Sequence, residues 1–151
     1  MIIALVWCNI LQAQSSSNDK TLGNSSSEVE IETKKFEQYT KALTDYNKAV
    51  RSYNAFINFR NKRFKPERSD ADIQKMIDNG LKSSANAFVL LNQIEKPEGQ
   101  LKTDTQVLHK DIKEIEKKLK EQQTWLKNYF SKKPMERTTM LMNLGGGIIM
   151  K

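Results

Sequence analysis

The chain has 151 residues, with 25 Lys or Arg against 18 Asp or Glu, a formal net charge of +7 and a pI near 9.4. This length predicts a single domain, and 38% hydrophobic with 28% charged residues is typical of a folded globular protein, which excludes disorder throughout. After the N-terminus no segment has the roughly 18 to 20 consecutive apolar residues of a membrane-spanning helix, so we expect no transmembrane span.

Residues 1–13 have the pattern of a secretory signal peptide. An apolar stretch over residues 2–11 is followed by Ala13 and then by a polar, serine-rich segment. Because no Lys or Arg precedes the apolar stretch, we expect a signal peptide that is truncated at its N-terminus and cleaved near Ala13. The alternative is an apolar segment that packs into the core. The sequence therefore predicts an exported protein of the bacterial periplasm or cell envelope.

Cys8 offers a second interpretation of the same segment. Residues 5–8, Leu-Val-Trp-Cys, resemble a bacterial lipobox, in which the cysteine is lipidated, but Trp7 stands where that motif has Gly, Ala or Ser. A lipoprotein anchored through Cys8 is thus the minor alternative. If cleavage follows Ala13 instead, the mature chain has no cysteine and its fold rests on packing without disulfides.

The next two segments predict a tether and a first long helix. Residues 14–30 are rich in Ser and Thr, which is typical of a flexible tether. The helix is expected to begin between Glu28 and Thr33 and to end near Phe64. Two sets of residues recur along it every seven positions: Phe36, Leu43, Val50, Ile57 and Phe64, and Tyr39, Tyr46, Tyr53 and Arg60. This spacing predicts the packing face of a helix. A carbohydrate or peptide groove lined by the three tyrosines is the alternative.

Two further helices follow. The second is expected to begin after an N-cap at Ser69 and to end near Glu95. The third runs from about Leu101 to Phe130, with a packing face formed by Leu101, Thr105, Leu108, Ile112, Ile115, Leu119, Gln122, Leu126 and Tyr129. On its outer face Glu114 precedes Lys118, and Glu116 precedes Lys120, by four residues, an arrangement that indicates a solvated surface.

These elements predict an all-α fold. Short connections make successive helices antiparallel, so residues 31–133 are expected to form an antiparallel, coiled-coil-like three-helix bundle. Residues 134–151 form an apolar tail that contains Gly145, Gly146 and Gly147. The tail either adds a short helix that covers the end of the bundle or docks a partner.

An up-down-up bundle brings cations and aromatic rings together at one end. We call this the basic/aromatic end, and its residues are Arg60, Lys62, Arg63, Phe64, Lys65, Arg68, Trp125, Tyr129, Lys132, Lys133 and Arg137. One interpretation is that these cations offset the dipoles at helix C-termini. The other is a docking site for an anionic or protein partner.

Other functions lack the residues that they need. The single histidine, His109, has no second histidine with which to form a metal site, and no glycine-flanked serine nucleophile or phosphate-binding loop is present. No helix-turn-helix, zinc-finger or RNA-binding motif accompanies the high pI. We expect no enzyme, no cofactor, no metal and no specific nucleic-acid partner.

The leading hypothesis is therefore a non-catalytic, exported scaffold or interaction module of the cell envelope, whose partner is a protein or an anionic envelope component. Peripheral contact with a membrane, and either a monomer or a homo-oligomer, are compatible with this hypothesis. The alternative is a Skp-like periplasmic holdase for unfolded clients. In size and charge the chain is similar to cationic coiled-coil holdase chaperones, but it has no segment with the β-strand pattern of their trimerising body.

Overall fold

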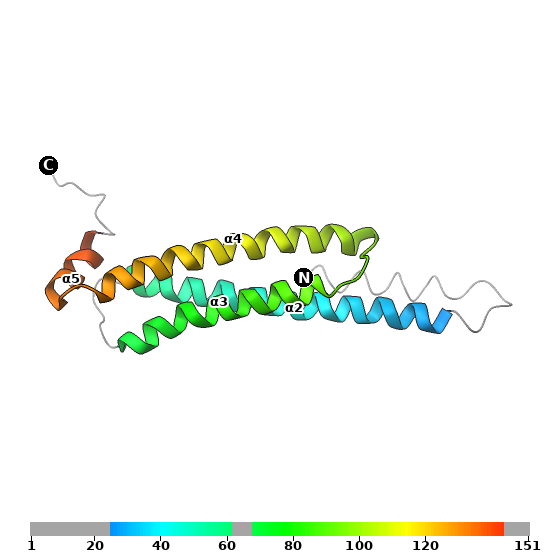
Figure 1. The fold of residues 1–151 in the computed structure, drawn as a ribbon, viewed down its shortest axis with the longest axis horizontal. Helices are drawn as coiled ribbons and strands as arrows, with labels where there is room; N and C mark the ends of the chain where they lie inside the picture. The colour runs from blue at the N-terminus through cyan, green and yellow to red at the C-terminus, as the bar shows by residue number, and fades with distance from the viewer. Residues whose placement is uncertain (1–24, 62–67, 144–151) are drawn as a thin grey trace. The chain divides into compact units, whose positions relative to one another are not determined.

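The computed structural model describes residues 25–61 and 68–143, and these residues form helices with no strand among them (Figure 1). The helices are α2 (Ser25–Asn61), α3 (Asp70–Asn92), α4 (Gly99–Phe130) and α5 (Pro134–Asn143). The predicted all-α bundle with a short C-terminal helix is confirmed. The expected signal peptide, Cys8, most of the tether and the tail beyond residue 143 lie outside the described residues.

The chain divides into two units, Met1–Thr33 and Lys34–Lys151. In the first unit, the described residues are the opening turns of α2, where Val29 and Ile31 are exposed. Helix α2 begins at Ser25, several residues before the predicted start, so residues 25–30 are helical and the predicted tether is wrong there. Glu28 lies in the first turn of the helix, where its negative charge offsets the helix dipole.

Local signals place the ends of the other helices close to their predicted positions. The Ser69 hydroxyl accepts a hydrogen bond from the Asp72 backbone N–H at 3.2 Å, as expected of an N-cap. Helix α3 ends at Asn92, three residues before the predicted end, and Lys96 and Gly99 adopt positive φ angles in the connection to α4. Pro134 is the first residue of α5, where its missing N–H costs nothing.

Contacts between α2, α3 and α4 give the direction of each helix within the second unit. Asn92 near the end of α3 hydrogen-bonds His109 near the start of α4 at 2.9 Å, and Gly80 in the middle of α3 faces Leu119 further along α4. Helix α3 therefore runs antiparallel to α4. Phe56 of α2 meets Trp125 of α4, so the later residues of both helices share one end (Figure 1).

The packing face of α4 agrees with the sequence pattern. Eight of the nine residues predicted for it are buried, and they are Thr105, Leu108, Ile112, Ile115, Leu119, Gln122, Leu126 and Tyr129. The ninth, Leu101, is half-buried against one of the two core clusters. A uniform series with steps of three and four residues was sufficient to identify this face.

The packing face of α2 lies beside the predicted one. Its fully buried residues are Ala42, Ala49 and Phe56, which also recur every seven positions. Leu43, Val50 and Ile57, and the three tyrosines, are half-buried around that line, whereas Phe36 is 45% exposed. Because α2 contacts two helices, its buried face is wider than a two-helix seam, and small alanines occupy its centre. The tyrosine rings pack against the core clusters.

The three helices approach one another closely at Gly80. A Cβ atom at this position would lie 2.7 Å from Leu119 Cδ2 on α4 and 3.2 Å from Ser52 Cβ on α2. Glycine is therefore required here by space. On the same face of α3 the small residues Ser84 and Ala87 are also buried, whereas the larger Leu81 and Phe88 are half-buried.

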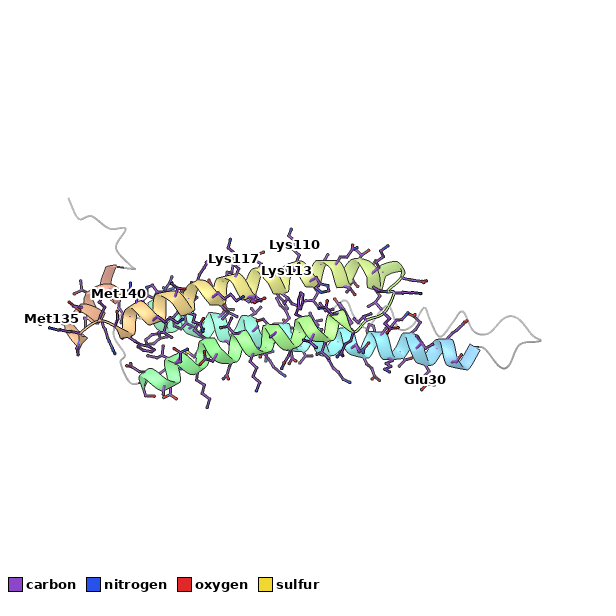
Figure 2. All side chains as sticks on the ribbon, in the orientation of Figure 1. Glu30, Lys110, Lys113, Lys117, Met135 and Met140 are labelled. Atoms are coloured by element: carbon purple, nitrogen blue, oxygen red, sulfur yellow. The ribbon has the colours of Figure 1, made fainter. Side chains whose placement is uncertain are left out.

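Helix α5 packs through Met140 and Leu141 against the core cluster that contains Phe56 and Leu126, while Met135 is 83% exposed (Figure 2). This is the covering role that the sequence allowed for the tail. Among the residues described, none of the helices has both the length and the apolar character needed to cross a membrane.

Candidate functional site

An aromatic cluster forms the core of the basic/aromatic end. Phe56 of α2 meets Trp125 of α4 edge to face with ring centroids 5.8 Å apart, and Trp125 stacks on Tyr129 at 5.3 Å and 17°. Phe56 occupies the heptad position that Ala42 and Ala49 hold earlier in α2. The bundle thus changes from small to large side chains at this end, where aromatic pairs add packing energy to their burial.

Arg60 is bound inside this end of the bundle. Its Nη1 donates a hydrogen bond to Gln122 Oε1, and its guanidinium carbon lies 5.7 Å from the centre of the Trp125 ring. Its Nε is buried and has no hydrogen-bond partner among the residues that the structure describes. Among the described residues no carboxylate pairs with this guanidinium, so its charge is held by a neutral amide and a ring.

Arg137 fastens α5 to both neighbouring helices. Its Nη1 donates to both carboxylate oxygens of Asp70 on α3, at 2.9 and 3.2 Å. Its Nε and Nη2 donate to the carbonyls of Lys132 and Phe130, each at 2.9 Å. The guanidinium also lies 5.2 Å from the centre of the Tyr129 ring. All three nitrogens are engaged, so Arg137 is a structural residue and does not present a free charge.

The remaining described cations of this end are exposed. No ion pair is formed by the side chains of Lys132 or Lys133 within the described residues. Arg68 is also exposed, and its Nη1 lies 3.7 Å from the Met76 sulfur. Lys62, Arg63, Phe64 and Lys65 lie outside the described residues.

The rings are only partly accessible. Trp125 and Phe130 are half-buried and Tyr129 is buried. Burial raises the pKa of the Tyr129 hydroxyl; the Arg137 guanidinium lowers this pKa and the Asp70 carboxylate raises it. The phenol therefore stays neutral at physiological pH. The arrangement can bind a partner electrostatically around a rigid aromatic base.

The outer face of α4 provides a contrast. The predicted pairs Glu114 with Lys118 and Glu116 with Lys120 are both formed, each at 2.6 Å. The hydrogen bond from Lys118 lowers the pKa of Glu114 and raises that of Lys118 itself. Lys110, Lys113 and Lys117 project from the same helix away from the core (Figure 2). These features fit the solvated surface predicted for this face.

The described residues contain no cluster of three or more His, Cys, Asp or Glu side chains that could hold a metal. His109 is occupied by its hydrogen bond to Asn92 and by edge-to-face contact with Phe88 at 5.2 Å. It is a packing residue at the interface between α3 and α4.

Comparison with protein families, characterised proteins and solved structures gave no match. The site is therefore argued from its own residues. Of the predicted set, the structure brings together Arg60, Trp125, Tyr129 and Arg137 through direct contacts. Sequence reasoning missed their polar partners, Gln122 and Asp70. The signal available for the first was a long polar side chain within an otherwise apolar series.

Proposed function

We propose that this protein is a non-catalytic, exported scaffold of the cell envelope that docks an anionic or protein partner through the basic/aromatic end. The proposal is carried by one observation: some cations of that end are held by contacts within the fold, and others are exposed. Arg60 and Arg137 are locked into the fold, whereas Lys132 and Lys133 are exposed without ion pairs in the described part of the chain.

The two exposed lysines lie on a segment that is held rigidly, and this favours binding. The contacts of Arg137 immobilise the segment between α4 and α5, so the two lysines lose little backbone freedom when a partner binds. Positive charge concentrated on one surface also steers an anionic partner toward it. The helix-dipole explanation accounts less well for Lys132 and Lys133, because they follow the end of α4 and precede α5 rather than lying within a last helical turn.

Export is supported by the pattern of residues 1–13, and the absence of catalysis by the engagement of His109 in packing. The partner class follows from the net positive charge of the chain, which favours acidic proteins or anionic envelope components.

The proposal is tested by crosslinking in the native host. A photoreactive amino acid is placed at Met135, which follows Lys133 by two residues and is 83% exposed, or, as the control, at Val107, an exposed residue of α4. We expect one discrete, stoichiometric partner band from position 135 and none from position 107. The band should weaken in Lys132→Glu, Lys133→Glu protein and persist in Lys113→Glu, Lys117→Glu protein, which carries the same change in charge.

Equal crosslinking from both positions, or a band that survives charge reversal at Lys132 and Lys133, would overturn the docking role. The holdase alternative predicts a different result. A holdase would protect an excess of unfolded client from aggregation in vitro and would give many weak bands in place of one.

A further inference from the structure

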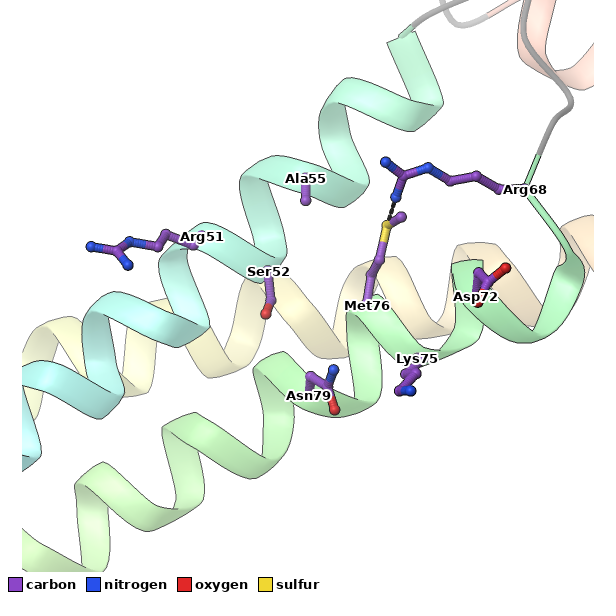
Figure 3. Close-up of a pocket in the computed structure, with 8 residues that line it drawn as sticks. All are labelled: Arg51, Ser52, Ala55, Arg68, Asp72, Lys75, Met76 and Asn79. Atoms are coloured by element: carbon purple, nitrogen blue, oxygen red, sulfur yellow. Dashed lines mark hydrogen bonds between the residues drawn. The ribbon is translucent and has the colours of Figure 1, made fainter.

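A groove of about 510 Å³ lies between α2 and α3, away from the helix faces that form the core. It exists because the two helices diverge along their length (Figure 3). They approach closely where Gly80 faces Ser52, and one turn further along α2 the large Phe56 ring takes the heptad position that Ala42 and Ala49 hold earlier in the helix. The groove opens on the side of the bundle where this separation grows.

The groove has a cationic rim and an apolar floor. Arg51, Arg68 and Lys75 contribute three exposed cations, and Ala55 and Met76 line the space between them. Figure 3 shows the Arg68 side chain extending from the start of α3 toward α2 across this space. The positive charge of the rim therefore comes from both helices, with Arg51 on α2 and Lys75 on α3.

Asp72 is the single carboxylate among the described residues that line the groove, and it is already engaged. It accepts a hydrogen bond from the Ser69 hydroxyl at 2.7 Å, and its backbone N–H donates to the same residue as part of the helix cap. None of the three cations forms an ion pair within the described residues. Among the described lining residues, three cations and one carboxylate therefore leave two uncompensated positive charges.

We propose that this groove binds the phosphate group of an organic phosphate monoester. A phosphate monoester carries close to two negative charges at neutral pH, which matches the uncompensated charge, whereas a carboxylate would leave one cation unmatched. Guanidinium groups donate paired hydrogen bonds to phosphate oxygens. Ser52 and Asn79, which also line the groove, add neutral hydrogen-bonding groups from both helices.

The dimensions and floor of the groove specify the rest of the ligand. A volume of about 510 Å³ exceeds what a phosphate group occupies, so the groove accommodates an organic group against Ala55 and Met76. The present contact of Arg68 with the Met76 sulfur, at 3.7 Å, is weak enough to be exchanged for a phosphate oxygen. This inference does not depend on the docking role of the basic/aromatic end.

The probe for the test is phenyl phosphate, titrated into the full chain and followed by backbone amide NMR shifts. We expect shifts centred on residues 51–55 and 75–79, with binding that weakens as the pH falls below about 6, where the phosphate loses its second charge. Benzoate, an aromatic carboxylate, should bind more weakly. Shifts spread evenly over all lysine-bearing surfaces, or equal binding of benzoate, would overturn the proposal.

Two matched variants complete the test. Arg51→Gln, Lys75→Gln protein should bind phenyl phosphate about tenfold more weakly, because two charge-assisted contacts are lost. Lys110→Gln, Lys113→Gln protein loses the same charge on α4 and should bind normally, as should Lys132→Glu, Lys133→Glu protein. Unchanged affinity of the groove variant, with unchanged circular dichroism, would refute the site.

A final comparison distinguishes the source of the phosphate. Sedimentation with phosphatidic acid vesicles, against phosphatidylcholine vesicles, tests a lipid headgroup. Loss of sedimentation in the groove variant but not in the Lys110, Lys113 variant would assign the phosphate to a lipid. Binding of phenyl phosphate without vesicle binding would assign it to a soluble ester, and binding of neither would overturn the proposal.

Discussion

Replacing Gly80 by alanine tests a close contact in the bundle. The added methyl would lie 2.7 Å from Leu119 Cδ2 and 3.2 Å from Ser52 Cβ, so it meets atoms of two different helices. Leu119 is fully buried, so its side chain must repack among its neighbours, and the Ser52 Cβ atom can move only with its backbone. The substitution therefore strains the packing of α3 against both neighbours.

The expected loss of stability is a difference between two opposing effects. Replacing glycine by alanine inside a helix stabilises it by about 1 kcal/mol. An extra methyl in a well-packed core costs about 1 to 3 kcal/mol, and contact with two helices places Gly80 toward the upper part of this range. We expect a net loss of about 1 to 2 kcal/mol in the free energy of unfolding.

Urea unfolding followed by far-ultraviolet circular dichroism measures this loss as a lower midpoint at unchanged slope. Asn86→Ala, at an exposed position of the same helix, is the control for helix propensity and should raise the midpoint slightly. In a double-mutant cycle, Leu119→Ala should cost less in the Gly80→Ala background than alone, since the new methyl partly fills the cavity. A midpoint raised by Gly80→Ala, with additive effects in the cycle, would refute the close approach.

Three other measurements test the contacts of the bundle end and of the tyrosines. Arg137→Met should lower the free energy of unfolding by about 2 kcal/mol, since charge-assisted hydrogen bonds to three partners are lost; an unchanged urea midpoint would contradict the fastening role. Gln122→Leu alone should destabilise by about 1 to 3 kcal/mol because it removes the one acceptor that the described residues offer to the half-buried Arg60 guanidinium, whereas adding Arg60→Leu should restore most of the loss; an equally unstable double variant would argue against this. Burial raises the pKa of Tyr39 and Tyr46 above 10.0 in the folded chain, with help from nearby carboxylates. Because the unfolded state then loses these protons first, stability is fully present below about pH 10 and falls as the pH rises toward the folded values. Absorbance at 295 nm should show delayed phenolate formation in folded protein, and identical titration in urea would refute it.

The fold followed from the sequence wherever one pattern held without interruption. The face of α4 was predicted almost residue by residue, because a helix with a long, narrow apolar series has only one way to bury it. The Ser69 cap and the outer ion pairs of α4 were equally predictable, since both depend on residues three or four positions apart.

The face of α2 was harder to predict because its centre is made of alanines. Ala42 and Ala49 contribute little to a hydrophobic pattern, yet they are fully buried where the helices lie close together. The neighbouring leucine, valine and tyrosine positions dominate the hydrophobic pattern, so the packing face predicted from it lies to one side of the alanines. The close packing of the helices at Gly80 favours burial of the small alanines over burial of these larger residues.

The basic/aromatic end was predicted as a composition but not as a set of contacts. Arg60 pairs with a residue 62 positions away, and Arg137 with one 67 positions away. Counting cations cannot distinguish a guanidinium held inside the fold from one that faces solvent. The structure makes that distinction: Arg60 and Arg137 are held in the fold, whereas Arg68, Lys132 and Lys133 are exposed.

The position of Trp125 gives this protein a natural optical probe. It is the only tryptophan in the described part of the chain, and its indole lies between Arg60, Phe56 and Tyr129. Its emission spectrum therefore reports on one end of the bundle alone, and cleavage near Ala13 would remove the other tryptophan, Trp7, as background. A single wavelength scan of unlabelled protein can therefore follow loosening of α5, opening of the aromatic cluster or binding at this end.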